Sequence, residues 1–145
     1  MTKLFKYNRI MILIQVFLFI GTFGWSQNMN LKVVGNAEQG FNVNIYNGAK
    51  LLIHNTEELN LKVANLDFSE TTEINDWKGS EWEGNETFVK LSKETYLSDF
   101  DLNLLISVTY EIINSNVVKK SIDLFQSGMP SLYYTLEENF KPAEI

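Results

Sequence analysis

The feature that most constrains the fold of this chain is the alternation of apolar and polar residues between Phe100 and Ile112. Every second position is apolar: Phe100, Leu102, Leu104, Ile106, Val108, Tyr110 and Ile112. A period of two is the signature of a β-strand that buries one face. A second alternating segment, 117–125, follows immediately after Asn114-Ser115-Asn116. The sequence therefore predicts one long antiparallel hairpin over residues 99–125.

The two faces of this hairpin predict the same register. Placing Ile106 opposite Leu124 pairs apolar residues on one face, and the same alignment places Glu111 opposite Lys119 on the other. Both are favourable cross-strand pairs. A slip of one residue would exchange the faces and break both sets of pairs together. We also expect a three-residue loop in which Asn116 adopts a left-handed conformation.

The first 26 residues carry the three regions of a secretory signal peptide. Three basic residues precede an apolar run at 10–20, and the small residues Gly24 and Ser26 form a cleavage site. The run is shorter than the roughly 20 apolar residues of a membrane-spanning helix, so a cleaved leader is favoured over an anchor. We expect a secreted or periplasmic bacterial protein that begins near Gln27.

Loss of the leader makes the chain strongly acidic. The leader holds three of the 12 Lys and Arg residues and none of the 18 Asp and Glu residues, which leaves nine basic residues and a net charge of −9. Such a surface disfavours nucleic acid and anionic membranes, which are bound through clustered Lys and Arg. The absence of cysteine excludes disulfides and thiolate zinc sites. Neutral partners such as oligosaccharides remain open.

The mature chain is expected to form a single all-β domain, an antiparallel β-sandwich, over residues 27–136. Residues 137–145 are interpreted as a C-terminal tail or the start of a linker. Further alternating segments lie at 31–36, 41–47, 49–54, 59–64, 87–97 and 131–136, and Asn47-Gly48 is a hairpin-turn signal. Alternation stops at 67–84, where we expect a long excursion with at most one short strand. Short strands without helical periods are typical of a sandwich.

Several segments resemble a known family. These are the hairpin segments 108–113 (VTYEII) and 117–124 (VVKKSIDL), together with 75–79 (NDWKG) and 82–84 (WEG). They are similar to the N-terminal β-sandwich domain of secreted bacterial glycoside hydrolases of the α-galactosidase type. The resemblance covers most of residues 30–136 and implies a supersandwich-like fold. In that family the catalytic carboxylates lie on a barrel that follows the sandwich, so no catalytic residue is carried over to this chain.

The best candidate for a ligand site lies in the acidic excursion. Two tryptophans five residues apart stand among three carboxylates, and the set is Asp76, Trp77, Glu81, Trp82 and Glu83. Aromatic faces stack on sugar rings while carboxylates accept hydrogen bonds from hydroxyl groups, so the pattern favours an oligosaccharide. The alternative is that one or both indoles cover the core. A catalytic acid and base pair at Glu81 and Glu83 is disfavoured, because 18 acidic residues form many such pairs by chance.

The remaining chemical signals are weak. His54 is the only histidine, and we expect it to bond a neighbouring loop rather than a metal. The acidic stretch 67–86 offers oxygen ligands for Ca²⁺ but lacks the regular aspartate spacing of a calcium loop. No phosphate-binding loop or hydrolase motif is present, so no cofactor is expected.

Two hypotheses of function follow. In the first, the chain is a non-catalytic, exported module associated with carbohydrate-active enzymes, acting beside a separate catalytic domain or chain. In the second, it is a free-standing carbohydrate- or surface-binding protein that uses the tryptophan loop. Both hypotheses describe a protein that is not itself an enzyme.

Leader removal is directly testable. The N-terminal sequence of exported material should begin at Gln27 or within one or two residues of it, because the small-residue site ends at Ser26. Full-length chain retained in the membrane fraction would contradict this prediction.

Overall fold

The computed structural model describes residues 14–19, 28–55, 60–127 and 131–137. Within these ranges the chain is all-β, and its one helical element is the single 3-10 turn Ser98–Phe100. The strands are β1 (Ile14–Phe19), β2 (Met29–Asn36), β3 (Gly40–Asn47), β4 (Lys50–Asn55), β5 (Asn60–Ala64), β6 (Thr71–Ile74), β7 (Glu81–Gly84), β8 (Phe88–Leu97), β9 (Leu102–Asn114), β10 (Val117–Gln126) and β11 (Tyr133–Glu137). The expected all-β antiparallel sandwich is confirmed.

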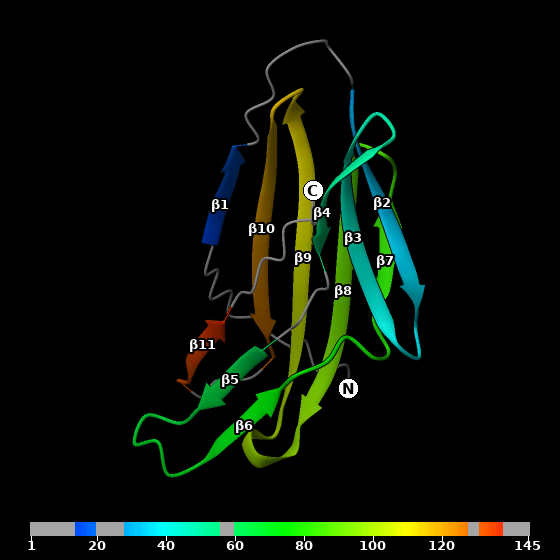
Figure 1. Ribbon diagram of the computed structural model, residues 1–145. Coiled ribbons are helices and arrows are strands. Elements are labelled where there is room, and N and C mark those ends of the chain that lie inside the picture. The colour runs from blue at the N-terminus through cyan, green and yellow to red at the C-terminus, as the bar shows by residue number, and fades with distance from the viewer. Residues whose placement is uncertain (1–13, 20–27, 56–59, 128–130, 138–145) are drawn as a thin grey trace, which may run out of the picture.

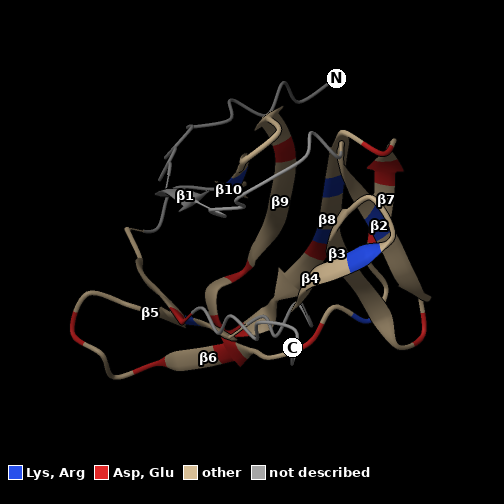
Figure 2. Cartoon of the chain, turned by 45° about the horizontal axis from the view of Figure 1, so that its top comes forward, with Lys and Arg blue, Asp and Glu red and all other residues tan. Residues whose placement is uncertain are grey.

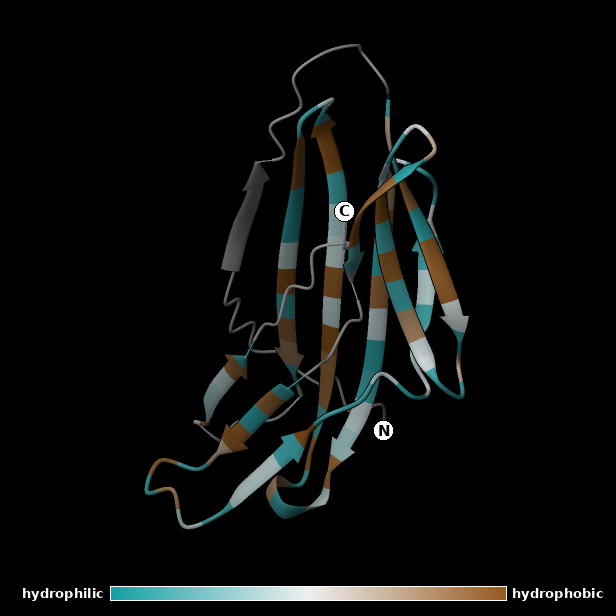
Figure 3. Ribbon diagram, viewed as in Figure 1, coloured by the Kyte–Doolittle hydropathy of each residue, from teal (hydrophilic) through white to brown (hydrophobic). Residues whose placement is uncertain are grey.

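The predicted long hairpin forms the centre of the largest sheet. Strands β9 and β10 lie between β1 and β8 in the order β1-β10-β9-β8-β7 (Figure 1). The register is the one predicted from the sequence, with Ile106 opposite Leu124 and Glu111 opposite Lys119. Figure 3 shows the alternation of hydrophobic and hydrophilic residues along β9 and β10.

The turn of this hairpin differs from the prediction. Asn114 pairs with Val117, so the loop contains two residues rather than three, and the register shifts by a bulge between Val117 and Val118. Asn116 has no positive φ. Its backbone N–H instead donates to the side-chain oxygen of Asn114 at 2.9 Å. The bulge leaves Ile113 of β9 without a paired residue, and this accounts for the loop being one residue shorter than predicted.

The turn between β3 and β4 also lies one residue later than predicted. Asn47 pairs with Lys50, so the two turn residues are Gly48 and Ala49. Only Gly48 has positive φ, at 60°. A positive φ at the first turn position alone is the pattern of a type II′ turn, in which glycine is preferred there.

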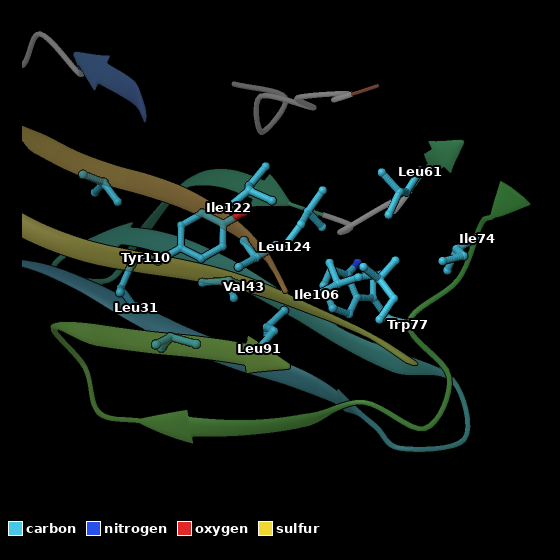
Figure 4. Close-up of a cluster of buried hydrophobic side chains, with 14 of the residues drawn as sticks. Leu31, Val43, Leu61, Ile74, Trp77, Leu91, Ile106, Tyr110, Ile122 and Leu124 are labelled. Atoms are coloured by element: carbon cyan, nitrogen blue, oxygen red, sulfur yellow. The ribbon is translucent and has the colours of Figure 1, made fainter. Parts of the chain in front are cut away.

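Two three-stranded sheets cover one face of the large sheet. Their orders are β2-β3-β4 and β11-β5-β6 (Figure 1). The side chains buried between the layers include Leu31 and Val43 from the first small sheet, Leu61 and Val63 from the second, and Ile106 from β9. Figure 4 shows this cluster. The core face of β9 is thus buried along most of its length, as the period of two requires.

The acidic excursion 67–84 contains two short strands, where we expected at most one. β6 belongs to a small sheet, whereas β7 forms an edge of the large sheet. The chain between them therefore crosses from one layer of the sandwich to the other. Four-residue strands in a stretch without alternation leave no periodic signal in the sequence.

Trp77 lies on this crossing and is a core residue. Its side chain is 3% exposed and belongs to the same buried cluster as Ile106 (Figure 4). Gly40, with φ +88°, passes so close that a Cβ there would lie 2.8 Å from the Cβ of Trp77. The indole N–H has no hydrogen-bond partner among the described residues. Packing therefore holds the indole in place, while the Trp77 backbone carbonyl accepts a hydrogen bond from the Ser80 N–H at 3.1 Å.

Replacement of Trp77 with alanine should lower the free energy of unfolding by about 3–5 kcal/mol, because a large buried aromatic is removed. Trp77→Phe should cost less, since it keeps an aromatic ring at this position and removes an N–H without a partner. Chemical denaturation of both variants beside Trp82→Ala, which truncates an exposed indole, measures the difference. Equal stability of all three variants would contradict the assignment of Trp77 to the core.

Candidate functional site

The short edge strand β7 presents different side chains on its two faces. Trp82 pairs with Leu91, a core residue of β8, whereas Glu81 pairs with Ser92 and Glu83 with Lys90. Paired residues share a face and neighbours along a strand alternate between faces. Trp82 therefore lies on the side of the sheet that faces the small sheets, and the two glutamates lie on the outer side.

Trp82 borders a cleft at the open edge of the sandwich. The cleft has a volume of about 400 Å³ and lies between β7 and β2, the edge strand of the neighbouring small sheet. Its lining also includes Leu31, Val33 and Val89. The Trp82 side chain is 45% exposed, so a large part of the indole faces solvent. The volume falls within the range of small-molecule sites.

Two amide residues and one charged residue of each sign complete the lining of the cleft. Asn30, Lys32, Asn85 and Glu86 contribute to its lining. The backbone carbonyl of Glu86 accepts a hydrogen bond from the N–H of Leu31 at 2.7 Å, which joins the two sheets at this point. The Lys32 and Glu86 side chains form no ion pair with any described residue. The lining of the cleft bordered by Trp82 thus includes one basic and one acidic residue.

The outer face of β7 holds a second, smaller hollow of about 200 Å³. Glu81, Glu83, Lys90 and Ser92 line it together with Trp82. Lys90 Nζ lies 3.7 Å from Glu83 Oε1 in a solvent-exposed ion pair. Figure 2 shows acidic residues on β7 beside basic residues on β8. Glu81 and Glu83 therefore meet Trp82 at this outer hollow, as the sequence pattern suggests, but they do not line the 400 Å³ cleft.

The other two residues of the predicted site are also placed elsewhere. Trp77 is buried and offers no face to a ligand, so the expected platform of two tryptophans does not form. Asp76 accepts a hydrogen bond from Lys93 Nζ at 2.6 Å. The same ammonium also donates to the backbone carbonyl of Asp76 at 2.8 Å. The bond from Lys93 is the main cause that lowers the pKa of Asp76 below its ordinary value of 3.8. Of the five residues, Trp82 alone lies at the cleft.

A second exposed aromatic group was missed by sequence reasoning. Phe68 and Tyr133 stack with ring centroids 5.1 Å apart and planes 11° from parallel, and they are 60% and 49% exposed. Phe68 has φ 58°, a left-handed conformation that a bulky residue rarely adopts. Residues 65 sequence positions apart carry no local signal of such a contact.

The structure also bears on the hypotheses about His54, a metal site and a membrane-spanning segment. His54 Nδ1 lies 2.9 Å from the side-chain oxygen of Asn44 on the paired strand β3, and the loop that follows it, 56–59, lies outside the described residues. No group of three or more His, Asp or Glu side chains suited to a metal occurs within the described ranges. Those ranges also hold no helix with the length and hydropathy needed to cross a membrane.

The chain was compared with protein families, curated proteins and solved structures. No protein-family model, curated protein or solved structure matches this chain.

The stabilisation contributed by the ion pair between Asp76 and Lys93 should depend on pH. Because the pKa of Asp76 is lowered in the folded chain, the stabilisation is present above about 3.8 and is lost as the pH falls through the lower folded-state value. Asp76 is 54% exposed, so we expect about 1 kcal/mol or less. Thermal melts of wild type and Asp76→Asn should differ at neutral pH and converge in acid. Glu83→Gln, which alters an exposed pair, is the control, and a difference that persists in acid would contradict the assignment.

Proposed function

We propose that this chain is an exported, non-catalytic β-sandwich module that binds oligosaccharide, acting beside a separate catalytic domain or chain. The observation that carries the proposal is the exposed indole of Trp82 at the mouth of a 400 Å³ cleft. An aromatic face and polar groups of both signs are complementary to a sugar ring, which has apolar faces and hydroxyl groups around its rim.

The charge of the chain supports a neutral ligand. The mature chain carries 18 acidic and nine basic residues, and the cleft contains one of each sign, Lys32 and Glu86. A polyanion would be repelled by the excess of acidic residues. Binding to a neutral sugar should therefore change little with salt concentration, because no net charge is neutralised.

The cleft favours binding over hydrolysis. Most glycoside hydrolases use two carboxyl groups that flank the scissile bond. Glu86 is the carboxylate among the described residues that line the cleft, while Glu81 and Glu83 lie on the opposite face of β7. The arrangement supports recognition of a sugar without its cleavage.

The test is a binding screen of neutral oligosaccharides with matched tryptophan variants. Trp82→Ala should raise Kd roughly 30-fold, which corresponds to a loss of about 2 kcal/mol for a central aromatic contact. Trp82→Phe should retain part of the affinity. Tyr96→Ala is the control, because Tyr96 is 58% exposed but lies near the other end of β8, where its hydroxyl donates to Asp101.

Fluorescence gives an independent readout. Of the three tryptophans, Trp25 lies in the predicted leader. In the mature Trp77→Phe variant, tryptophan fluorescence therefore comes from Trp82 alone. This emission should change as sugar is added. A wild-type protein that binds no neutral oligosaccharide, or a Trp82→Ala variant that binds as tightly as wild type, would overturn the proposal.

A further inference from the structure

The two edges of the large sheet differ in how they are protected. At one edge, β7 has only four residues and carries Glu81 and Glu83. Short, charged edge strands resist pairing with other chains. At the other edge, β1 pairs with β10 from Ile14 opposite Ile122 to Phe19 opposite Val117. The edge of β10 is thus covered by a strand rather than by charge.

The covering strand lies within the predicted leader. Residues 14–19 belong to the segment 1–26 that we expect to be removed on export. Without them, β10 is an edge strand of ten residues within the part of the chain that the structure describes, and it contains no proline. It carries the charged residues Lys119, Lys120 and Asp123, and a further strand can add to such an edge where it pairs charges of opposite sign. The full register with β1 shows that β10 accepts an antiparallel partner there.

The sequence of β10 is complementary to itself in one register. In a two-fold pair that continues the sheet, Lys119 can lie opposite Asp123 of the second copy, and symmetry repeats this ion pair. Ser121 then lies opposite Ser121 of the second copy. Moving the centre to Lys120 would place two ammonium groups together. Moving it to Ile122 would break both Lys119–Asp123 ion pairs, because Lys119 would then lie opposite Phe125 of the second copy.

The core face of β10 matches in the same register. Val118 lies opposite Leu124 of the second copy, so two apolar residues that are buried in each subunit meet across the interface. Lys120 lies opposite Ile122 of the second copy. Its ammonium is 5.4 Å from the centroid of the Tyr110 ring in its own subunit. That cation–π contact holds the charge within the subunit.

We propose that removal of the leader exposes β10, and that two mature chains then pair through it as a symmetric dimer. The interface joins the strands β10-β9-β8-β7 of each copy into one continuous sheet. Residues 14–19 act before removal as a temporary cover of this edge. The proposal does not depend on what the Trp82 cleft binds.

The first experiment uses the full chain, expressed with its own N-terminus in a bacterial host. Intact mass identifies the N-terminus, and light scattering gives the oligomeric state of the same sample. A species that begins near Gln27 should be a dimer, and a species that retains residues 14–19 should be a monomer. A concentrated monomer without the leader, or a dimer that retains it, would overturn the proposal.

The second experiment reverses the two charges separately. K119E and D123K each place like charges together twice in the dimer, and each should raise the dimer Kd roughly tenfold or more. An equimolar mixture should form a heterodimer, because the carboxylate introduced by K119E in one chain then meets the ammonium introduced by D123K in the other. Within one subunit Asp123 faces Ser107, whereas Lys119 faces Glu111, so D123K is the variant less disturbed in its own fold. Folded D123K that dimerises like wild type would contradict the register.

Discussion

The register of β9 against β10 is the constraint on which the rest of the structure depends. Because Ile106 lies opposite Leu124, most residues on one face of the central pair are apolar, with Lys120 and Gln126 as buried polar exceptions, and two small sheets cover this face. The opposite face pairs Glu111 with Lys119 and stays polar. A slip of one residue would expose the apolar face and bury the charges, so a single pairing decides where every other strand packs.

The same alternation decides the composition of the candidate site. Trp82 lies between Glu81 and Glu83 in the sequence, yet a strand sends neighbouring side chains to opposite faces. The carboxylates therefore join Lys90 on the outer surface, while the indole borders the cleft with β2. The sequence could predict this separation only if residues 81–84 were assigned to a strand. This segment contains a single apolar residue, which is too few to establish a period of two.

The hairpin, the sandwich class and most strand positions were predictable because they follow from periodic patterns in the sequence. The excursion was not, since its structure depends on contacts between distant residues. Trp77 is buried because β6 and β7 belong to different layers and the chain must pass between them near Gly40. Phe68, on the loop that joins β5 and β6, likewise stacks on the distant residue Tyr133 of β11. The predictions of the two hairpin turns were wrong in detail. A bulge, or a turn shifted by one residue, leaves the alternation of the flanking strands almost unchanged, so the sequence pattern does not reveal it.

The two proposals together have a geometric consequence. Trp82 lies on one edge strand of the large sheet and the proposed dimer contact on the other, so a two-fold pair places its two clefts at opposite edges of a sheet of eight strands. With neighbouring strands about 4.8 Å apart, the edges are separated by roughly 30 Å, less where the sheet twists. A short oligosaccharide cannot reach both clefts, whereas a polysaccharide chain can. Such a dimer would gain avidity for polymers without any new contact, because the second cleft binds its ligand intramolecularly.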